Sequence, residues 1–178
     1  RIYLCLAHMS GNEQKFIQEA FDTNWVVPLG PNVDAFETEL ENYVGENKKV
    51  VALTSGTSAI HLALVACGVK AGDEVITQSF TFCASANPIT YLGATPIFID
   101  SERDTWNIDP QLLEEAIKDR IEKTGNTPKA IITVSIYGMP YKIDEIAEIA
   151  NRYDIPIIED AADAFGSKYK GQVLGTFG

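Results

Sequence analysis

The chain has 178 residues, 46% of them hydrophobic and 22% charged, a composition that lets one domain, or most of one, bury a core. Its 14 basic and 25 acidic residues give a net charge of −11, which argues against binding to nucleic acid or to an anionic membrane, because both need a basic surface. No apolar run is long enough to span a membrane and no cleavable signal pattern follows Arg1, so we expect a cytoplasmic protein. Three separated cysteines and two histidines predict neither a disulfide framework nor a metal site.

Hydrophobic spacing predicts the elements in chain order. Two helices are expected first, near residues 12–22 and 32–43, joined by a link at residues 25–31 that is punctuated by Pro and Gly. Short apolar runs then alternate with segments of helical spacing. The expected strands are 50–54, 74–78, 95–99, 130–134 and 155–158, and the expected helices are 57–67, 82–91, 109–120 and 143–153. This alternation predicts an α/β fold with a mostly parallel sheet covered by helices.

Ligands of such sheets bind beyond the carboxyl ends of the strands, so the residues that follow each run are candidates for a site. The turn Ser55-Gly56-Thr57-Ser58 opens directly into a helix, whose first N–H groups suit a phosphate, although an ordinary N-cap explains it as well. This turn lacks the glycine spacing of a dinucleotide-binding domain or a P-loop. Phe80 and Phe82 follow the next run, and either one ring stacks on a flat heterocycle or both are core residues.

Acidic residues follow the run at residues 155–158, in the segment Glu159-Asp160-Ala161-Ala162-Asp163. A carboxylate at the end of a buried strand is costly unless a donor or a cation pairs with it, which favours a functional role for Asp160. A structural ion pair explains the residue equally well. Side chains alternate along a strand, so Glu159 and Asp160 are expected on opposite faces, and Asp160 is the better candidate.

Several motifs, in this order and spacing, resemble the DegT/StrS family of nucleotide-sugar aminotransferases. They are Thr54–Leu64, Gly72–Ile76, Gly93–Pro96, Glu159–Ala162 and Gly175–Gly178. The resemblance runs nearly end to end and is greatest to the enzymes that aminate UDP-4-keto-6-deoxy-N-acetylhexosamines. It implies an N-terminal helical segment over residues 1–48 and, over residues 49–178, part of the three-layer large domain of fold type I transferases that depend on pyridoxal 5′-phosphate (PLP).

The resemblance also implies how the residues would bind this cofactor. Gly56, Thr57 and Ser58 would hold the phosphate through backbone N–H groups, and Phe82 would stack on the pyridine ring. Asp160 would pair with the pyridinium nitrogen and keep it protonated, so that the ring acts as an electron sink. Asp160 is therefore the expected catalytic residue of this chain, and no metal is expected.

Two positions depart from the family pattern. Asp163 stands where the family often has His or Gln near the cofactor's 3′-oxygen, and it would repel a phenolate there unless protonated or turned away. Ser135 stands where the family often has His. The family has the lysine that forms the Schiff base a short distance beyond the Gly175–Gly178 motif, so the resemblance implies that it lies beyond Gly178. Lys168 and Lys170 stand in a polar, turn-rich ribbon at residues 166–175 and are expected at the surface. The domain is therefore expected to be incomplete at its C-terminus, and these residues alone are expected to be inactive.

The implied reaction transfers an amino group from glutamate to a nucleotide-linked 4-keto-6-deoxyhexose in a homodimer, for the synthesis of a surface polysaccharide or glycan. UDP and a 2-acetamido group are the expected nucleotide and substituent. Three alternatives stay open. They are a His-based sugar 3-dehydratase of the same family, a non-catalytic member, and a nucleotide-binding Rossmann domain, which the first turn disfavours.

Overall fold

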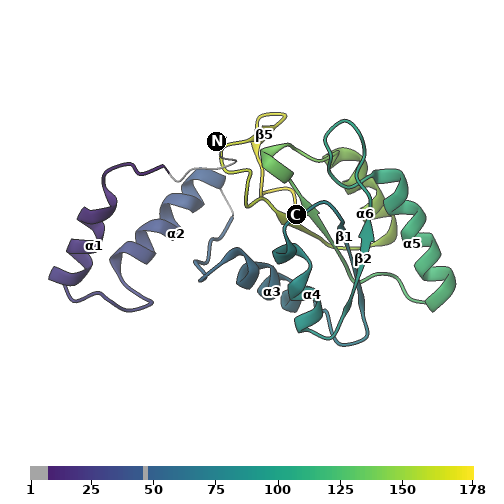
Figure 1. The fold of residues 1–178 in the computed structure, drawn as a ribbon, viewed down its shortest axis with the longest axis horizontal. Coiled ribbons are helices and arrows are strands. Elements are labelled where there is room, and N and C mark those ends of the chain that lie inside the picture. Colours follow the sequence, from purple (N-terminus) through teal and green to yellow (C-terminus); the bar gives the residue numbers. More distant parts are fainter. Residues whose placement is uncertain (1–7, 46–47) are drawn as a thin grey trace, which may run out of the picture. The chain divides into compact units, whose positions relative to one another are not determined.

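The computed structural model describes residues 8–45 and 48–178, and the chain divides into two compact units, Arg1–Ala52 and Leu53–Gly178 (Figure 1). The first unit contains the helices α1 (Glu13–Asp22) and α2 (Pro31–Val44). The link between them is held by Trp25, whose ring lies so close to Gly30 that a Cβ there would come within 2.7 Å of Trp25 Cε3. Gly30 also has φ of +125°, which side-chain-bearing residues rarely adopt, so both its conformation and its neighbour require glycine.

The strand expected at residues 50–54 is not formed. Two of the backbone donors of this segment bond to side chains of α2: the N–H of Ala52 donates to Glu37 Oε1 at 2.7 Å, and that of Val50 to Glu41 Oε1 at 3.2 Å. A strand exists only where a neighbouring strand accepts its hydrogen bonds, and here carboxylates accept them. The prediction was therefore wrong for this segment.

The second unit is built on a parallel sheet. Its strands are β1 (Glu74–Gln78), β2 (Thr95–Ile99), β3 (Ala130–Val134) and β4 (Ile157–Asp160), arranged in the order β2-β1-β3-β4. All neighbouring pairs are parallel. Every residue of β3 is buried, which explains why the sequence shows a continuous apolar run there. The expected mostly parallel sheet is confirmed.

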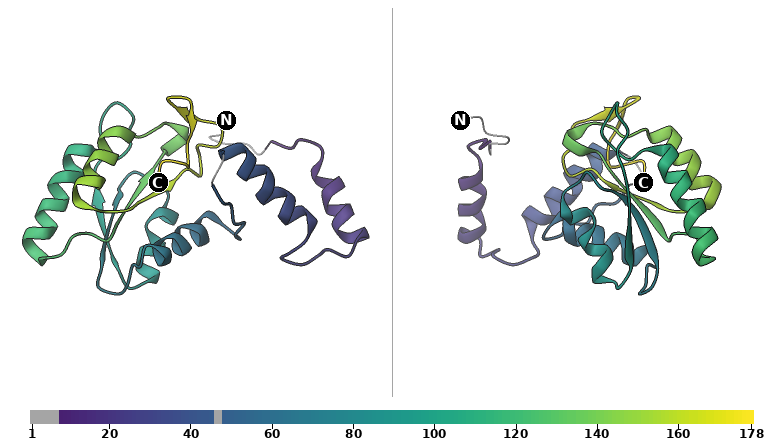
Figure 2. Two further views of the ribbon diagram at one scale, coloured as in Figure 1. Left: turned by 180° about the vertical axis from the view of Figure 1, so that it is seen from behind. Right: turned by 45° about the vertical axis from the view of Figure 1, so that its right-hand side comes forward.

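Helices cover both faces of this sheet (Figure 2). On one face, α5 (Pro110–Thr124) and α6 (Ile143–Tyr153) pack against alternate strand residues such as Ile76 and Ile131. On the other face, α3 (Gly56–Ala66) and α4 (Asn87–Tyr91) pack against the intervening residues, among them Val75 and Ile132. The alternation of side chains along each strand therefore supplies two separate cores and the expected three layers.

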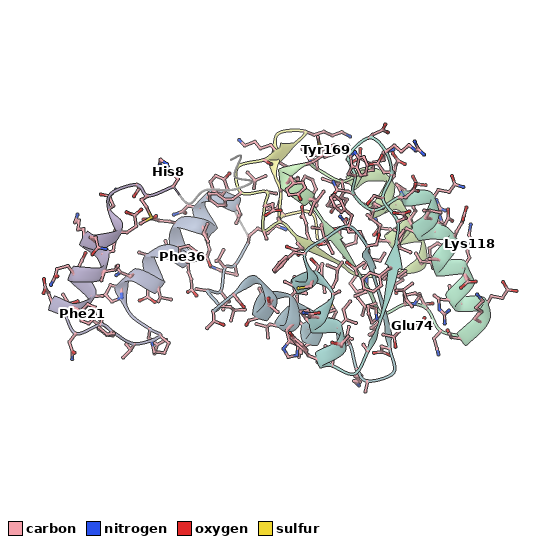
Figure 3. All side chains as sticks on the ribbon, in the orientation of Figure 1. His8, Phe21, Phe36, Glu74, Lys118 and Tyr169 are labelled. Atoms are coloured by element: carbon pink, nitrogen blue, oxygen red, sulfur yellow. The ribbon has the colours of Figure 1, made fainter. Side chains whose placement is uncertain are left out.

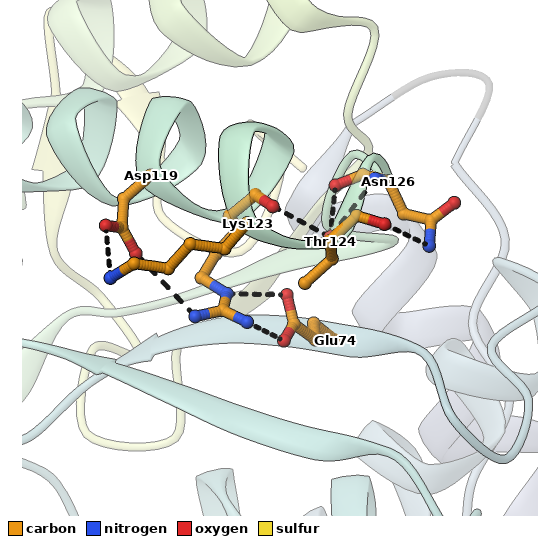
Figure 4. A network of polar contacts seen from close by, with 6 residues as sticks. Glu74, Asp119, Lys123, Thr124 and Asn126 are labelled. Atoms are coloured by element: carbon orange, nitrogen blue, oxygen red, sulfur yellow. Dashed lines mark hydrogen bonds and ion pairs between the residues drawn. The ribbon is translucent and has the colours of Figure 1, made fainter.

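An ion pair joins β1 to α5 at the start of the strand (Figure 4). Arg120 Nη2 lies 2.8 Å from Glu74 Oε1, and Arg120 Nε donates to Glu74 Oε2 at 3.0 Å, so the guanidinium binds the carboxylate through two bonds. This contact with Glu74 raises the pKa of Arg120. The network stabilises the end of the sheet opposite to the carboxyl ends of the strands.

The expected polar ribbon is a short hairpin made by β5 (Lys168–Tyr169) and β6 (Gln172–Val173). Tyr169, labelled in Figure 3, donates a hydrogen bond from its hydroxyl to Asp144 Oδ2 at 2.8 Å. The Nζ of Lys170 pairs with the same carboxylate. Lys168 and Lys170 are both exposed, as the sequence predicts for this ribbon. Among the helices of residues 8–45 and 48–178, none has the length and apolar character needed to cross a membrane.

Candidate active site

A cavity of about 270 Å³ lies at the carboxyl ends of β3 and β4. Its wall is formed by four segments: the start of α3, the residues after β1, the residues at the end of β3, and those at the end of β4. This is the edge of a parallel sheet at which ligands are expected. The lining residues are Gly56, Thr57, Ile60, Thr81, Phe82, Ala84, Ser85, Val134, Ile136, Asp160, Ala162 and Asp163.

The start of α3 directs backbone donors at this cavity. Ser55 is the N-cap, in extended conformation, and its hydroxyl accepts the N–H of Ser58 at 3.2 Å. Ser58 is not part of the wall, and its hydroxyl lies within hydrogen-bond distance of those of Thr54 and Ser55. Among the described residues, the N–H groups of Gly56 and Thr57 have no acceptor. These two groups, with the positive end of the helix dipole, form a site suited to an anion.

Phe82 lies on the wall with three quarters of its surface exposed, and Phe80 is 43% exposed. The alternative in which both rings are core residues is therefore wrong. An aromatic ring left open to solvent beside a cavity offers a flat apolar face to a ligand.

Asp160 is the last residue of β4, and its carboxylate is fixed by two donors. The Ser85 hydroxyl donates to Oδ2 at 2.7 Å, and the N–H of Ala162 donates to Oδ1 at 3.3 Å. No Lys, Arg or His of the described chain forms an ion pair with Asp160, so the structural ion pair that the sequence left open is not seen within residues 8–45 and 48–178. The carboxylate charge is thus held in place without a cation from this part of the protein.

Ser85 is a site residue that sequence reasoning missed. It is only 1% exposed, and its hydroxyl also lies 2.8 Å from the hydroxyl of Thr81. Because Ser85 donates to Asp160, the Thr81 hydroxyl is left to donate to Ser85, which makes a chain of two hydroxyls that ends on the carboxylate. The contact joins residues 75 apart in the sequence, and a small hydroxyl residue in a short helical turn carries no pattern that predicts it.

Glu159 takes the opposite side of β4, as the alternation of side chains requires. Its Oε2 accepts the N–H of Phe177 at 2.9 Å, and it does not line the cavity. Glu159 is therefore bound to the segment after the hairpin and is separate from the site.

Asp163 lines the cavity but turns one carboxylate oxygen to the backbone. Its Oδ2 accepts the N–H of Tyr137 at 3.3 Å. Gly138 allows this close approach: a Cβ at that position would lie 3.1 Å from the carbonyl oxygen of Asp163, and the φ of Gly138 is +81°. Ser135, the other position that departs from the family pattern, donates its N–H to the carbonyl of Asp160 at 3.1 Å, and its side chain is buried.

Several known proteins are similar to this chain in sequence. The chain is 53% identical over all 178 residues to EpsN of Bacillus subtilis and covers 45% of it. It is 41% identical over 178 residues to the GDP-perosamine synthase of Caulobacter vibrioides, covering 46% of that protein. It is also 46% identical over 144 residues, 81% of this chain, to the UDP-2-acetamido-2-deoxy-3-oxo-D-glucuronate aminotransferase of Pseudomonas aeruginosa, of which 38% is covered. The chain therefore spans less than half the length of these curated relatives.

A solved structure agrees with this similarity. Spr1654 of Streptococcus pneumoniae in its PLP form superposes with a TM-score of 0.86 and 30% sequence identity over 99% of this chain and 46% of that chain. This confirms the expected large domain of fold type I. Aminotransferases of this family depend on PLP, which is the cofactor expected from the resemblance. The DegT/DnrJ/EryC1/StrS aminotransferase family matches residues 8–178, and the chain belongs to that family.

Proposed function

We propose that the protein carrying this chain is a PLP-dependent enzyme that transfers an amino group from glutamate to a nucleotide-linked keto sugar. The observation that carries the proposal is the Asp160 carboxylate, fixed by Ser85 in the same cavity as the open N–H groups of α3 and the exposed ring of Phe82. Family membership supports the same class of reaction.

The residues of the cavity fit the three chemical parts of PLP. The N–H groups of Gly56 and Thr57 would bind the phosphate, and the ring of Phe82 would pack on the pyridine. The Asp160 carboxylate would accept a hydrogen bond from the protonated ring nitrogen. When bound, the cofactor supplies an electron sink for proton removal at the carbon that carries the amine.

The residues of this chain have separate tasks around that group. The negative charge of Asp160 favours the protonated form of a nitrogen placed beside it. Ser85 and the N–H of Ala162 hold the carboxylate in one orientation, and Thr81 in turn holds Ser85. Ile60 and Val134 contribute apolar surface to the wall of the cavity, and an apolar surrounding strengthens the interaction between the two charges.

The finer assignment of the substrate is a UDP-linked 4-keto-6-deoxyhexose with a 2-acetamido group. Its support is the resemblance of the sequence motifs. The names of two relatives, GDP-perosamine synthase and UDP-2-acetamido-2-deoxy-3-oxo-D-glucuronate aminotransferase, both contain a nucleotide-linked sugar but differ in the nucleotide. The homodimer and the cytoplasmic location stay predictions.

An amination assay of the full-length protein tests the proposal. Purified protein with PLP and glutamate is offered UDP-, GDP- and dTDP-linked 4-keto sugars and their 3-keto isomers, and the products are identified by mass spectrometry. We expect an amino sugar and one 2-oxoglutarate for each UDP-linked 4-keto sugar consumed. Preference for a 3-keto or dTDP-linked sugar would refute the finer substrate assignment. Loss of the C3 hydroxyl without amine transfer would identify the His-based dehydratase, and bound PLP with no reaction would identify a non-catalytic member.

A further inference from the structure

The wall of the cavity, as far as the described residues form it, offers Asp160 no opposite charge. Its ionisable side chains are Asp160 and Asp163, and both are acidic. The end of β3 contributes the apolar side chains of Val134 and Ile136, and the start of α3 contributes Ile60 and the backbone donors of the anion site. An apolar surrounding and a like charge both favour the neutral form of a carboxyl group. Hydrogen bonds donated to Asp160 therefore have to stabilise its charged form.

The two donors to this carboxylate are unequal. The Ser85 hydroxyl lies 2.7 Å from Oδ2, a normal length for a hydroxyl bound to a carboxylate. The N–H of Ala162 lies 3.3 Å from Oδ1, which is longer than the usual range for an N–H donor. Ser85 is also only 1% exposed, so solvent has little access to its hydroxyl. Ser85 is thus the stronger of the two groups that favour the charged form of Asp160.

Thr81 strengthens the donor. A serine hydroxyl has one hydrogen, and Ser85 uses it on Asp160, so Ser85 accepts the hydrogen of the Thr81 hydroxyl, 2.8 Å away. A hydroxyl that accepts a hydrogen bond is polarised and donates a stronger one. Thr81 therefore acts on Asp160 without touching it.

The backbone holds Ser85 in place before any ligand binds. Ser85 is the last residue of the 3₁₀ turn Cys83–Ser85, and its N–H donates to the carbonyl of Phe82 at 3.1 Å. Its backbone is thus bonded to the residue whose ring faces the cavity, while its side chain is bonded to the carboxylate. A donor fixed in this way needs no rearrangement when a charged ligand arrives.

We propose that Ser85, assisted by Thr81, is a positioning residue that determines where the proton between Asp160 and the ring nitrogen of the cofactor lies. The Ser85 bond stabilises the carboxylate, so the proton stays on the nitrogen. Without this bond, the carboxylate competes more strongly for the proton. A neutral pair, a carboxylic acid beside an unprotonated nitrogen, then gains population at the expense of the charged pair. The proposal rests on the proposed function, because it concerns the cofactor assigned to the same cavity.

The protonation state of the ring nitrogen can be measured separately from the reaction. Full-length holoenzyme is reconstituted with PLP that carries ¹⁵N in its ring, and the ¹⁵N resonance, which differs strongly between the two protonation states, is followed with pH. We expect Ser85→Ala to lower the midpoint of ring deprotonation by about one pH unit, a tenfold change in the equilibrium, which is the scale of one hydrogen bond to a charged group. Thr81→Val should lower the midpoint by less, because it removes only the assistance.

Two variants serve as matched controls. Thr81→Ser keeps the hydroxyl that donates to Ser85 and should titrate as the wild type does. Thr90→Val removes a hydroxyl on α4 that donates to the carbonyl of Asn87 at 2.8 Å and lies outside the cavity, so it should leave the midpoint unchanged. The Thr81 pair keeps the test valid even if Ser85→Ala does not fold, because Thr81 is only partly buried.

The melting temperature, the cofactor absorbance and its change on adding glutamate are recorded for the same samples. If the wild type retains no PLP or does not respond to glutamate, the proposed function fails, whatever the variants show. If PLP is bound normally but Ser85→Ala and Thr81→Val titrate as the wild type does, the inference is wrong. A lower melting temperature with an unmoved midpoint would show that the two hydroxyls only stabilise the fold, and this too would overturn it. Equal shifts in Thr81→Ser and Thr81→Val would trace the effect to packing and contradict the role of the hydroxyl.

Discussion

Replacement of Asp160 by Asn removes the charge of this side chain and keeps its shape, so it measures the effect of the charge alone. The carboxylate accepts hydrogen bonds from Ser85 and from the N–H of Ala162. The amide oxygen of Asn can accept the N–H of Ala162, and its nitrogen can donate to the Ser85 hydroxyl. Ser85 can then donate to Thr81, because either hydroxyl of that pair can be the donor. We therefore expect Asp160→Asn to change the free energy of unfolding by about 1 kcal/mol or less, the scale of one exchanged hydrogen bond.

The loss of charge has a larger effect on the reaction. An opposite charge within hydrogen-bond distance typically shifts the pKa of its partner by about 1 to 3 units, so the ring nitrogen of the cofactor loses a comparable amount of proton affinity. Apolar side chains on the cavity wall, such as Ile60 and Val134, strengthen the interaction of the charge with its partner, which places the effect toward the upper end of that range. At a pH where the nitrogen is no longer protonated, kcat is expected to fall by roughly 100- to 1,000-fold.

The assay is the rate of amination in the full-length protein, together with the melting temperature and the cofactor absorbance of the same samples. Glu159→Gln is the matched control, because it removes a carboxylate from the neighbouring residue on the opposite face of β4, outside the cavity. Asp163→Asn removes the other carboxylate of the cavity and is expected to cost less than Asp160→Asn. A kcat near that of the wild type in Asp160→Asn, with the cofactor bound and the fold intact, would refute the role assigned to this residue.

Three other substitutions have expected outcomes. Phe82→Ala should weaken PLP retention by about 1 kcal/mol, or roughly 5-fold, the scale of a lost ring contact, as measured by equilibrium dialysis; unchanged retention would exclude stacking by this ring. Asp109 caps α5 by accepting the N–H groups of Gln111 at 2.8 Å and Leu112 at 3.2 Å, so Asp109→Ala should lower the free energy of unfolding in urea by about 1 kcal/mol, whereas Asp109→Ser should retain most of it. Burial raises the pKa of Glu102, but hydrogen bonds from Thr105 and Asp104 and the charge of Lys142 lower it by more, so its pKa lies below the ordinary 4.5. The Glu102 carboxylate therefore contributes fully to stability above pH 4.5, and this contribution is lost as the pH falls through the lower pKa of the folded state. Glu102→Gln should flatten the dependence of the unfolding free energy on pH in this acidic range. An unchanged pH dependence would contradict the stabilising role of Glu102.

The sequence predicted most elements of the second unit because their burial is regular. In α6 the apolar residues Ile143, Ile146 and Ile149 recur on one face, and the helix has the predicted bounds. The helix expected over residues 82–91 is instead a 3₁₀ turn at Cys83–Ser85 followed by α4, which begins at Asn87. Pro88 explains the division, since a residue without an N–H fits the first turn of a helix but not its interior.

The site was predictable only in part, for a physical reason. Asp160 and Phe82 follow apolar runs, so their place at the end of a strand can be deduced from local pattern. Ser85 donates to Asp160, 75 positions away in the sequence. The buried Asn107 accepts the N–H of Ile136, a residue of the cavity wall 29 positions away. No local pattern encodes such contacts. The left-handed backbone of Trp106, with φ of 62°, is likewise an observation of the folded chain that the apolar pattern does not predict.

The location of the cavity follows from the order of the strands. From β1 the chain crosses through α4 to β2 at one side, while from β3 it crosses through α6 to β4 at the other side. Crossovers between parallel strands are right-handed, so two that run in opposite directions place their helices on opposite faces of the sheet, which is where α4 and α6 lie. The segments that leave β1 and β3 therefore diverge, and a crevice opens between them at the carboxyl edge. Ser85 comes from the first segment, Ile136 from the second, and Asp160 from the adjacent strand β4, so strand order and crossover handedness alone bring the donor, the wall and the carboxylate together.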